Sequence, residues 1–97
     1  MGLKKVDLEA IENSLNKVLE ISAQTRLFQD QLEDSLEYEK ENEEFFKEGK
    51  ISKKVYEKNK TKIEKEKNKL ANKIDANISL LQENVKLIEK ELKSCKI

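Results

Sequence analysis

The sequence predicts an all-α fold, a long antiparallel two-helix coiled-coil hairpin that forms a single domain over residues 1–97. Composition is the first reason, because 41% of the residues are charged and the chain has two glycines and no proline from which to build loops. The second reason is that apolar residues recur at helical spacing. The third is that residues 1–48 carry 13 acids against 6 bases, a net charge of −7, whereas residues 49–97 carry 7 against 14, a net charge of +7.

The two kinds of charge are concentrated on either side of Gly49. The tract 30–48 holds nine acidic residues and two lysines, and the tract 50–73 holds ten lysines and three glutamates. A chain that folds back at Gly49 lays the acidic tract beside the basic one. Exposed ion pairs contribute about 0–1 kcal/mol each and are screened by salt, so we expect them to select the pairing and direction of the helices.

The first helix is expected over about residues 7–48. Asp7 is a favourable N-cap, and Val6 and Ile11 stand at the two positions of a hydrophobic staple around it. Ser22 and Thr25 interrupt the apolar stripe, which makes that stretch the weakest part of the expected helix–helix contact.

A turn is expected at about residues 49–52. Gly49 can adopt the left-handed conformation that ends a helix, and Ser52 can cap the next one. Ile51 and Tyr56 stand at the positions of a second staple. Three aromatic residues are predicted to close the tip of the hairpin: Phe45, Phe46 and Tyr56.

The second helix is expected over about residues 53–95 and contains two runs of residues seven apart. The first run is Tyr56, Ile63 and Leu70; the second is Ile74, Leu81, Ile88 and Cys95. A stutter between Leu70 and Ile74 is predicted to join them. The expected companions of the second run in the seam are Ala71, Ile78, Val85 and Leu92, and Leu80 and Leu87 widen it. Cys95 is read as a buried small apolar residue, with an intermolecular disulfide or a reactive thiol as the alternative.

The half of the hairpin that lies far from the turn has more apolar residues than one partner helix can cover. The expected interaction residues are Leu15, Leu19, Leu80, Leu87, Ile88 and Leu92. A two-helix chain has a small core and is expected to need further burial of apolar surface for stability. The sequence therefore predicts either a homo-oligomer, namely a dimer that closes a four-helix bundle, or assembly with another coiled-coil protein.

The side chains give little support to catalysis. The chain has no histidine, a single cysteine and no glycine-rich loop, so we expect no enzyme, no cofactor and no metal site. The single cysteine and the lack of a long apolar run favour a cytoplasmic protein without a transmembrane segment.

Residues 46–63, which contain Gly49, Ile51, Ser52, Tyr56 and a lysine-rich continuation, resemble the turn of the short helical hairpins called SHOCT domains. That resemblance implies an oligomerisation role. Two other functions stay open. The lysine-rich arm could bind nucleic acid or an acidic membrane, although the net charge of zero argues against it. The long arms also suggest a hairpin subunit similar to those of prefoldin-type chaperones or of trafficking complexes.

Overall fold

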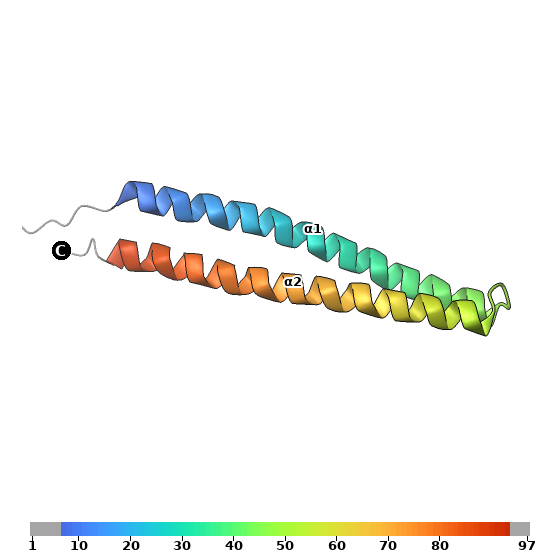
Figure 1. Cartoon of the computed structure of the whole chain (residues 1–97). Helices are drawn as coiled ribbons and strands as arrows, with labels where there is room; N and C mark the ends of the chain where they lie inside the picture. The colour runs from blue at the N-terminus through green and yellow to red at the C-terminus, as the bar shows by residue number, and fades with distance from the viewer. Residues whose placement is uncertain (1–6, 94–97) are drawn as a thin grey trace, which may run out of the picture. The chain divides into compact units, whose positions relative to one another are not determined.

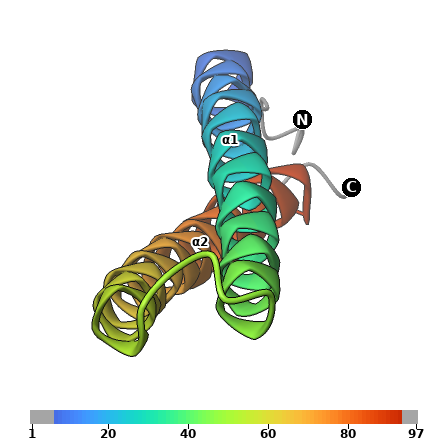
Figure 2. The ribbon, with the colours of Figure 1, turned by 90° about the vertical axis from the view of Figure 1, so that its right-hand side faces the viewer.

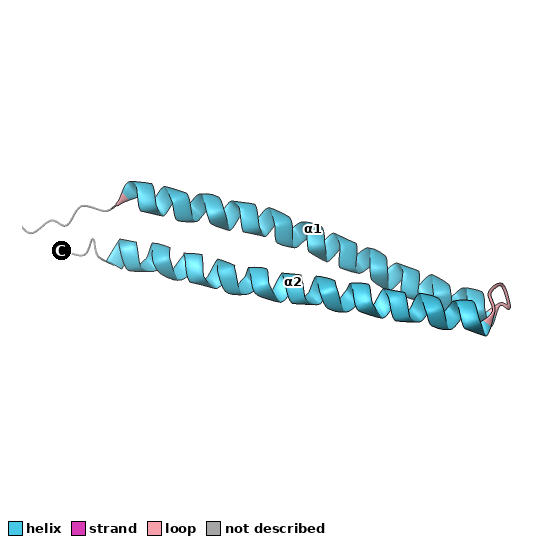
Figure 3. Ribbon diagram, in the orientation of Figure 1, coloured by secondary structure: helices cyan, strands magenta, loops and turns pink. Residues whose placement is uncertain are grey.

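The computed structural model describes residues 7–93 and contains two helices, α1 at Leu8–Lys47 and α2 at Lys53–Lys93 (Figure 1). Helix and one connecting turn account for the described residues, and none of them forms a strand (Figure 3). The two helices run antiparallel, so the predicted all-α helical hairpin is confirmed. Cys95 and the last residues of the second expected helix lie outside the described residues.

Helix α1 begins where its first backbone donors find an acceptor. The Ala10 N–H donates to Asp7 Oδ1 at 2.9 Å, and the Ile11 N–H donates to the Asp7 carbonyl at 3.1 Å. The expected N-cap is therefore confirmed. Val6, its expected staple partner, lies outside the described residues. The Asp7 N–H also donates to Glu91 Oε1 at 2.9 Å, which joins the start of α1 to the end of α2.

Helix α1 ends at Gly49, which has a φ of +72°. The Lys50 N–H donates to the Phe45 carbonyl at 2.8 Å, and the Gly49 N–H donates to the Phe46 carbonyl at 3.1 Å. These two bonds form a Schellman motif, whose left-handed position suits a residue without a Cβ atom. The predicted role of Gly49 is confirmed.

Helix α2 begins at the predicted cap. Ser52 Oγ accepts from the Val55 N–H at 3.2 Å, and the Ser52 carbonyl accepts from the Tyr56 N–H at 2.9 Å. Ile51 is half-buried and Tyr56 is buried. Figure 2 shows the short connection from the end of α1 to the start of α2.

The hairpin divides into two compact units, which we call the turn unit (Arg26–Ile74) and the terminal unit (Met1–Thr25 with Asp75–Ile97). Each unit contains a piece of α1 and a piece of α2. Of the terminal unit, residues 7–25 and 75–93 are described.

The less exposed side chains of each helix form a heptad seam. On α1 they alternate in steps of three and four: Ile11, Ser14, Val18, Ile21, Thr25, Phe28, Leu32, Ser35, Glu39 and Asn42. On α2 they are Tyr56, Asn59, Ile63, Lys67, Leu70, Ile74, Asn77, Leu81, Asn84, Ile88 and Glu91. The α1 series has the spacing of the a and d positions of a coiled coil, and so does the α2 series from Ile63 onward, whereas Asn59 stands one residue before an a position.

The predicted seam of α2 beyond Leu70 was half right: Ile74, Leu81 and Ile88 lie in the seam, but their predicted companions do not. The run Tyr56, Ile63, Leu70 continues at the same phase, and the predicted companions lie outside it. Those companions are Ala71, Ile78, Val85 and Leu92, all exposed. The reason is that α2 is one unbroken helix, and moving its seam from Leu70 to Ala71 would rotate the buried face by about 100°. The step from Leu70 to Ile74 is an ordinary a/d step rather than a stutter.

Two apolar residues are buried among residues 7–93, and both belong to the turn unit. Leu70 is 1% exposed and Tyr56 is 8% exposed, and both project from α2. The remaining buried positions are occupied by Thr25, Ser35, Asn42, Asn77 and Asn84. A core with so many polar residues favours a defined register over high stability.

Candidate interaction surface

A buried asparagine fixes the register of the helices near the turn. Asn42 Nδ2 donates to the Tyr56 carbonyl at 3.1 Å, and its Oδ1 accepts from Asn59 Nδ2 at 3.0 Å. The Asn42 amide therefore bonds through both its nitrogen and its oxygen, and any sliding of α1 along α2 would leave it unpaired. Nothing in the apolar pattern predicted that Asn42 or Asn59 would lie in the seam.

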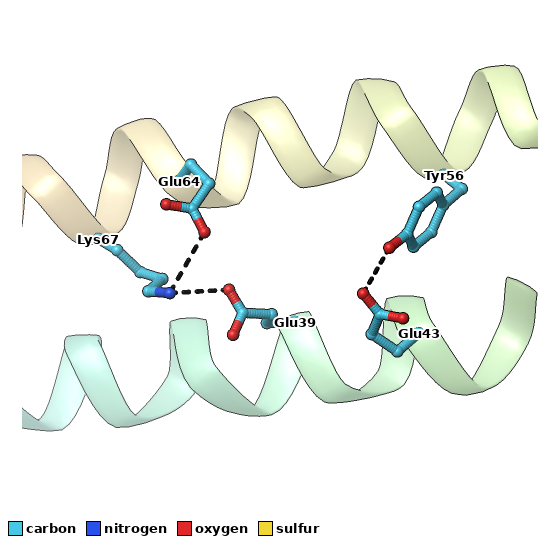
Figure 4. Close-up of polar contacts among 5 residues, drawn as sticks. All are labelled: Glu39, Glu43, Tyr56, Glu64 and Lys67. Atoms are coloured by element: carbon cyan, nitrogen blue, oxygen red, sulfur yellow. Dashed lines mark hydrogen bonds and ion pairs between the residues drawn. The ribbon is translucent and has the colours of Figure 1, made fainter.

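Tyr56 closes the tip of the hairpin. Its ring stacks on the Phe46 ring with centroids 4.3 Å apart and an interplanar angle of 16°. Its hydroxyl donates to Glu43 Oε1 at 2.5 Å (Figure 4). This hydrogen bond, with burial and the Glu43 charge, raises the pKa of Tyr56 from 10.0 to about 12. Phe45 does not join the stack, and the Lys50 ammonium lies 5.4 Å from its ring.

Lys67 makes the ion pair that joins the two helices within the turn unit. Its Nζ lies 2.8 Å from Glu39 Oε2 on α1 and 3.4 Å from Glu64 Oε1 on its own helix (Figure 4). The hydrogen bond with Lys67 lowers the pKa of Glu39, and the same bond raises the pKa of Lys67. The other ion pair of this unit, between Lys50 and Glu48, lies within the turn.

The acidic and basic tracts, which the sequence predicts side by side, make few direct ion pairs. One cross-helix ion pair forms because the a and d positions face the partner helix, whereas most acids and lysines occupy the outward positions. Leu70, the stack on Tyr56 and the Asn42 hydrogen bonds supply the specific contacts. The charged tracts act through their overall fields.

The terminal unit has an unusual distribution of side chains. Its buried residues are Thr25, Asn77 and Asn84, all of them polar. The Thr25 hydroxyl donates to the Ile21 carbonyl at 2.7 Å, and Asn84 Nδ2 donates to the Leu80 carbonyl at 2.8 Å. Their hydrogen-bonding groups are thus partly satisfied within their own helices, which makes a polar seam tolerable.

The large apolar residues of the terminal unit lie mostly on its outside. Five of the predicted interaction residues are exposed: Leu15, Leu19, Leu80, Leu87 and Leu92. The sixth, Ile88, is half-buried in the seam. Leu8, Ile78 and Val85 are exposed too, and sequence reasoning missed them as surface residues. The phase of Tyr56, Ile63 and Leu70, extended at seven-residue steps, would have identified Ile78 and Val85.

Grooves on the two sides of the turn unit show how the helix flanks are arranged. One open groove of about 660 Å³ is lined by Tyr38 and Phe45 of α1 and by Glu66 of α2. The other, of about 510 Å³, is lined by Leu36 and Glu43 of α1 and by Glu64 of α2. Residues directly before an a position, such as Tyr38 and Glu66, thus line one side of the helix pair. Residues directly after a d position, such as Leu36 and Glu64, line the other side. The second groove is lined mostly by charged side chains, whereas Tyr38, Phe45 and Ile63 make much of the first apolar.

No cluster of metal-ligating side chains occurs among residues 7–93. No helix in that range is long and apolar enough to cross a membrane. Comparison of the chain with protein-family models, with curated proteins and with solved structures gives no match.

Proposed function

We propose that the protein is a non-enzymatic assembly module, whose terminal unit packs its exposed apolar side chains against further helices. These helices belong either to other copies of the chain or to another coiled-coil protein. One observation carries the proposal: the terminal unit buries polar residues and exposes eight large apolar ones. Those eight are Leu8, Leu15, Leu19, Ile78, Leu80, Val85, Leu87 and Leu92.

The physical reason is that a helix pair without a buried apolar residue gains little from folding. Burial of apolar surface is the main favourable contribution to folding, at roughly 25 cal/mol per Å². Among residues 7–25 and 75–93 no apolar side chain is fully buried and the seam residues Ile11, Val18, Ile21, Leu81 and Ile88 are only half-buried, so the pair leaves part of this contribution unused. Large apolar side chains on both helices of one unit are typical of a surface that another protein covers.

Light scattering, sedimentation and affinity purification test this function together. We expect the full chain either to self-associate at micromolar concentration or to retain a helical partner from its native cell. A variant with Leu15, Leu19, Leu80, Leu87 and Leu92 all replaced by Gln should lose both. A wild-type chain that stays monomeric, melts cooperatively and retains no partner that the variant lacks would contradict the proposal.

Binding of a polyanion by the lysine tract is less well supported. Lys53, Lys58 and Lys62 are exposed, but α1 carries the acidic tract alongside them within the same unit. The turn unit has 13 basic and 12 acidic residues in all, so its net charge is +1. Binding of nucleic acid depends on a surplus of positive charge.

A further inference from the structure

We infer that the partner of the terminal unit is a second copy of this chain, which packs on one particular side of the helix pair. This inference rests on the proposed function and deepens it. We call that side the apolar flank. It consists of Leu8, Leu15 and Leu19 from α1 with Ile78, Val85 and Leu92 from α2.

The heptad positions place these six residues on one side. Leu8 and Leu15 are seven residues apart and each is an e position, one residue after a d position of the seam; Leu19 follows Leu15 by one helical turn. Ile78, Val85 and Leu92 are the e positions of α2, directly after Asn77, Asn84 and Glu91.

In an antiparallel pair the e positions of both helices lie on the same side, as Leu36, Glu43 and Glu64 do in the turn unit. The hydrogen bond from Asn77 to Gln24, at 3.4 Å, sets the register in the terminal unit. In this register Leu15 lies near the level of Val85.

The pattern of apolar positions distinguishes a bundle from a plain two-helix coiled coil. Two helices need apolar residues only at a and d, whereas a helix in a four-helix bundle is also apolar at e or g. In the terminal unit five of the six e positions are large and apolar, with Ser22 as the exception. In the turn unit the e positions are mostly polar: Gln29, Leu36, Glu43, Glu57, Glu64 and Ala71. Apolar e positions thus belong mainly to the terminal unit, where they stand beside apolar a positions, whereas the d positions Ser14, Asn77 and Asn84 are polar.

Charge and area both favour a second copy as the occupant. The terminal unit has eight acidic and seven basic residues in all, a net charge of −1, so two copies meet without strong repulsion. Six side chains that are 42–73% exposed leave roughly 500–600 Å² per copy, and a symmetric pair would cover about 1,000–1,200 Å². That area reaches the size at which specific interfaces begin, about 1,000 Å².

Two matched variants test the side that is used. Leu15→Gln with Leu92→Gln changes the apolar flank, and Leu80→Gln with Leu87→Gln changes the opposite side of the same unit by the same chemistry. The four side chains are 44–55% exposed, so the two variants remove similar amounts of apolar surface. In sedimentation equilibrium from 1 to 300 μM, we expect a wild-type dimer whose dissociation constant is raised at least about 100-fold by the first variant. The second variant changes residues at the edge of the interaction surface, so we expect it to raise the dissociation constant by less than about 10-fold.

Each outcome of these measurements supports or contradicts a specific part of the inference. Equal weakening by both variants, or weakening by the second alone, overturns the choice of flank but keeps the assembly function. A wild-type monomer at every concentration overturns the second copy as partner, and affinity purification then decides the function separately. If a variant loses helicity, nitroxide labels at Val85→Cys and Leu87→Cys in a Cys95→Ser background replace it. We expect the label at 85 to be immobilised as the protein concentration rises and the label at 87 to stay mobile; the reverse refutes the inference.

Discussion

Replacement of Leu70 by Ala should strongly destabilise the turn unit. Leu70 is 1% exposed, so nearly its whole side chain has left water. Removing three carbon atoms at about 0.8 kcal/mol each costs about 2.4 kcal/mol, and the residual cavity adds to that loss. A two-helix seam can close in from its open sides, so we expect the total to stay near the lower end of the measured range for Leu→Ala changes, about 2.5–3 kcal/mol.

Leu27→Ala is the matched control, because the same atoms are removed from a side chain that is 54% exposed. Its expected cost is below about 1 kcal/mol, since half of the surface stays in water and alanine is the better helix former. Urea unfolding followed by circular dichroism at 222 nm, at one fixed protein concentration, measures both changes. Equal losses for the two variants would refute the assignment of Leu70 to the core of the turn unit.

Three further changes probe the contacts of the turn unit. The raised pKa of Tyr56 means that its hydrogen bond to Glu43 stabilises the fold fully below pH 10 and is lost as the pH rises through about 12. Tyr56→Phe should therefore remove a late tyrosine ionisation, which is measured as absorbance at 295 nm. An unchanged titration would contradict the hydrogen bond. The pKa of Glu39 is lowered, so the stabilisation from its ion pair with Lys67 is present above pH 4.5 and is lost as the pH falls further. Glu39→Gln should lower the melting temperature at neutral pH in 10 mM salt, and should lower it less in 1 M salt. An effect that does not depend on salt would count against the ion pair. Gly49→Ala places a Cβ atom at a φ of +72°, and we expect a loss of about 1 kcal/mol although nothing lies within 4 Å of that atom; a neutral result in urea unfolding would argue against the left-handed turn.

The sequence predicted the hairpin and its turn because these depend on local chemistry. Gly49 and Ser52 act through backbone hydrogen bonds to near neighbours, so their roles could be derived from residue type and spacing. The same is true of Asp7 at the start of α1. The sorted charges indicated which segments run side by side.

The seam of α2 could not be derived in the same way, because the phase of a long helix is set where it packs most tightly. Leu70 and the contacts of Tyr56 fix that phase near the turn, and an unbroken helix carries it onward. Asn77 and Asn84 are therefore buried although apolar neighbours stood one residue away. A rule that assigns the most apolar run to the seam fails wherever the apolar run serves a different contact.

The wrong prediction of Ile78 and Val85 as seam residues and the proposed assembly have the same physical cause. If Ile78 and Val85 had stood in the seam in place of Asn77 and Asn84, the terminal unit would have buried them with Leu81 and Ile88 against α1. With Asn77 and Asn84 in the seam instead, Ile78 and Val85 are exposed. In the proposed assembly further helices would cover these two side chains, and the polar seam positions would then couple the stability of the terminal unit to assembly. The turn unit, which keeps Leu70 and Tyr56 buried, does not depend on assembly in that way.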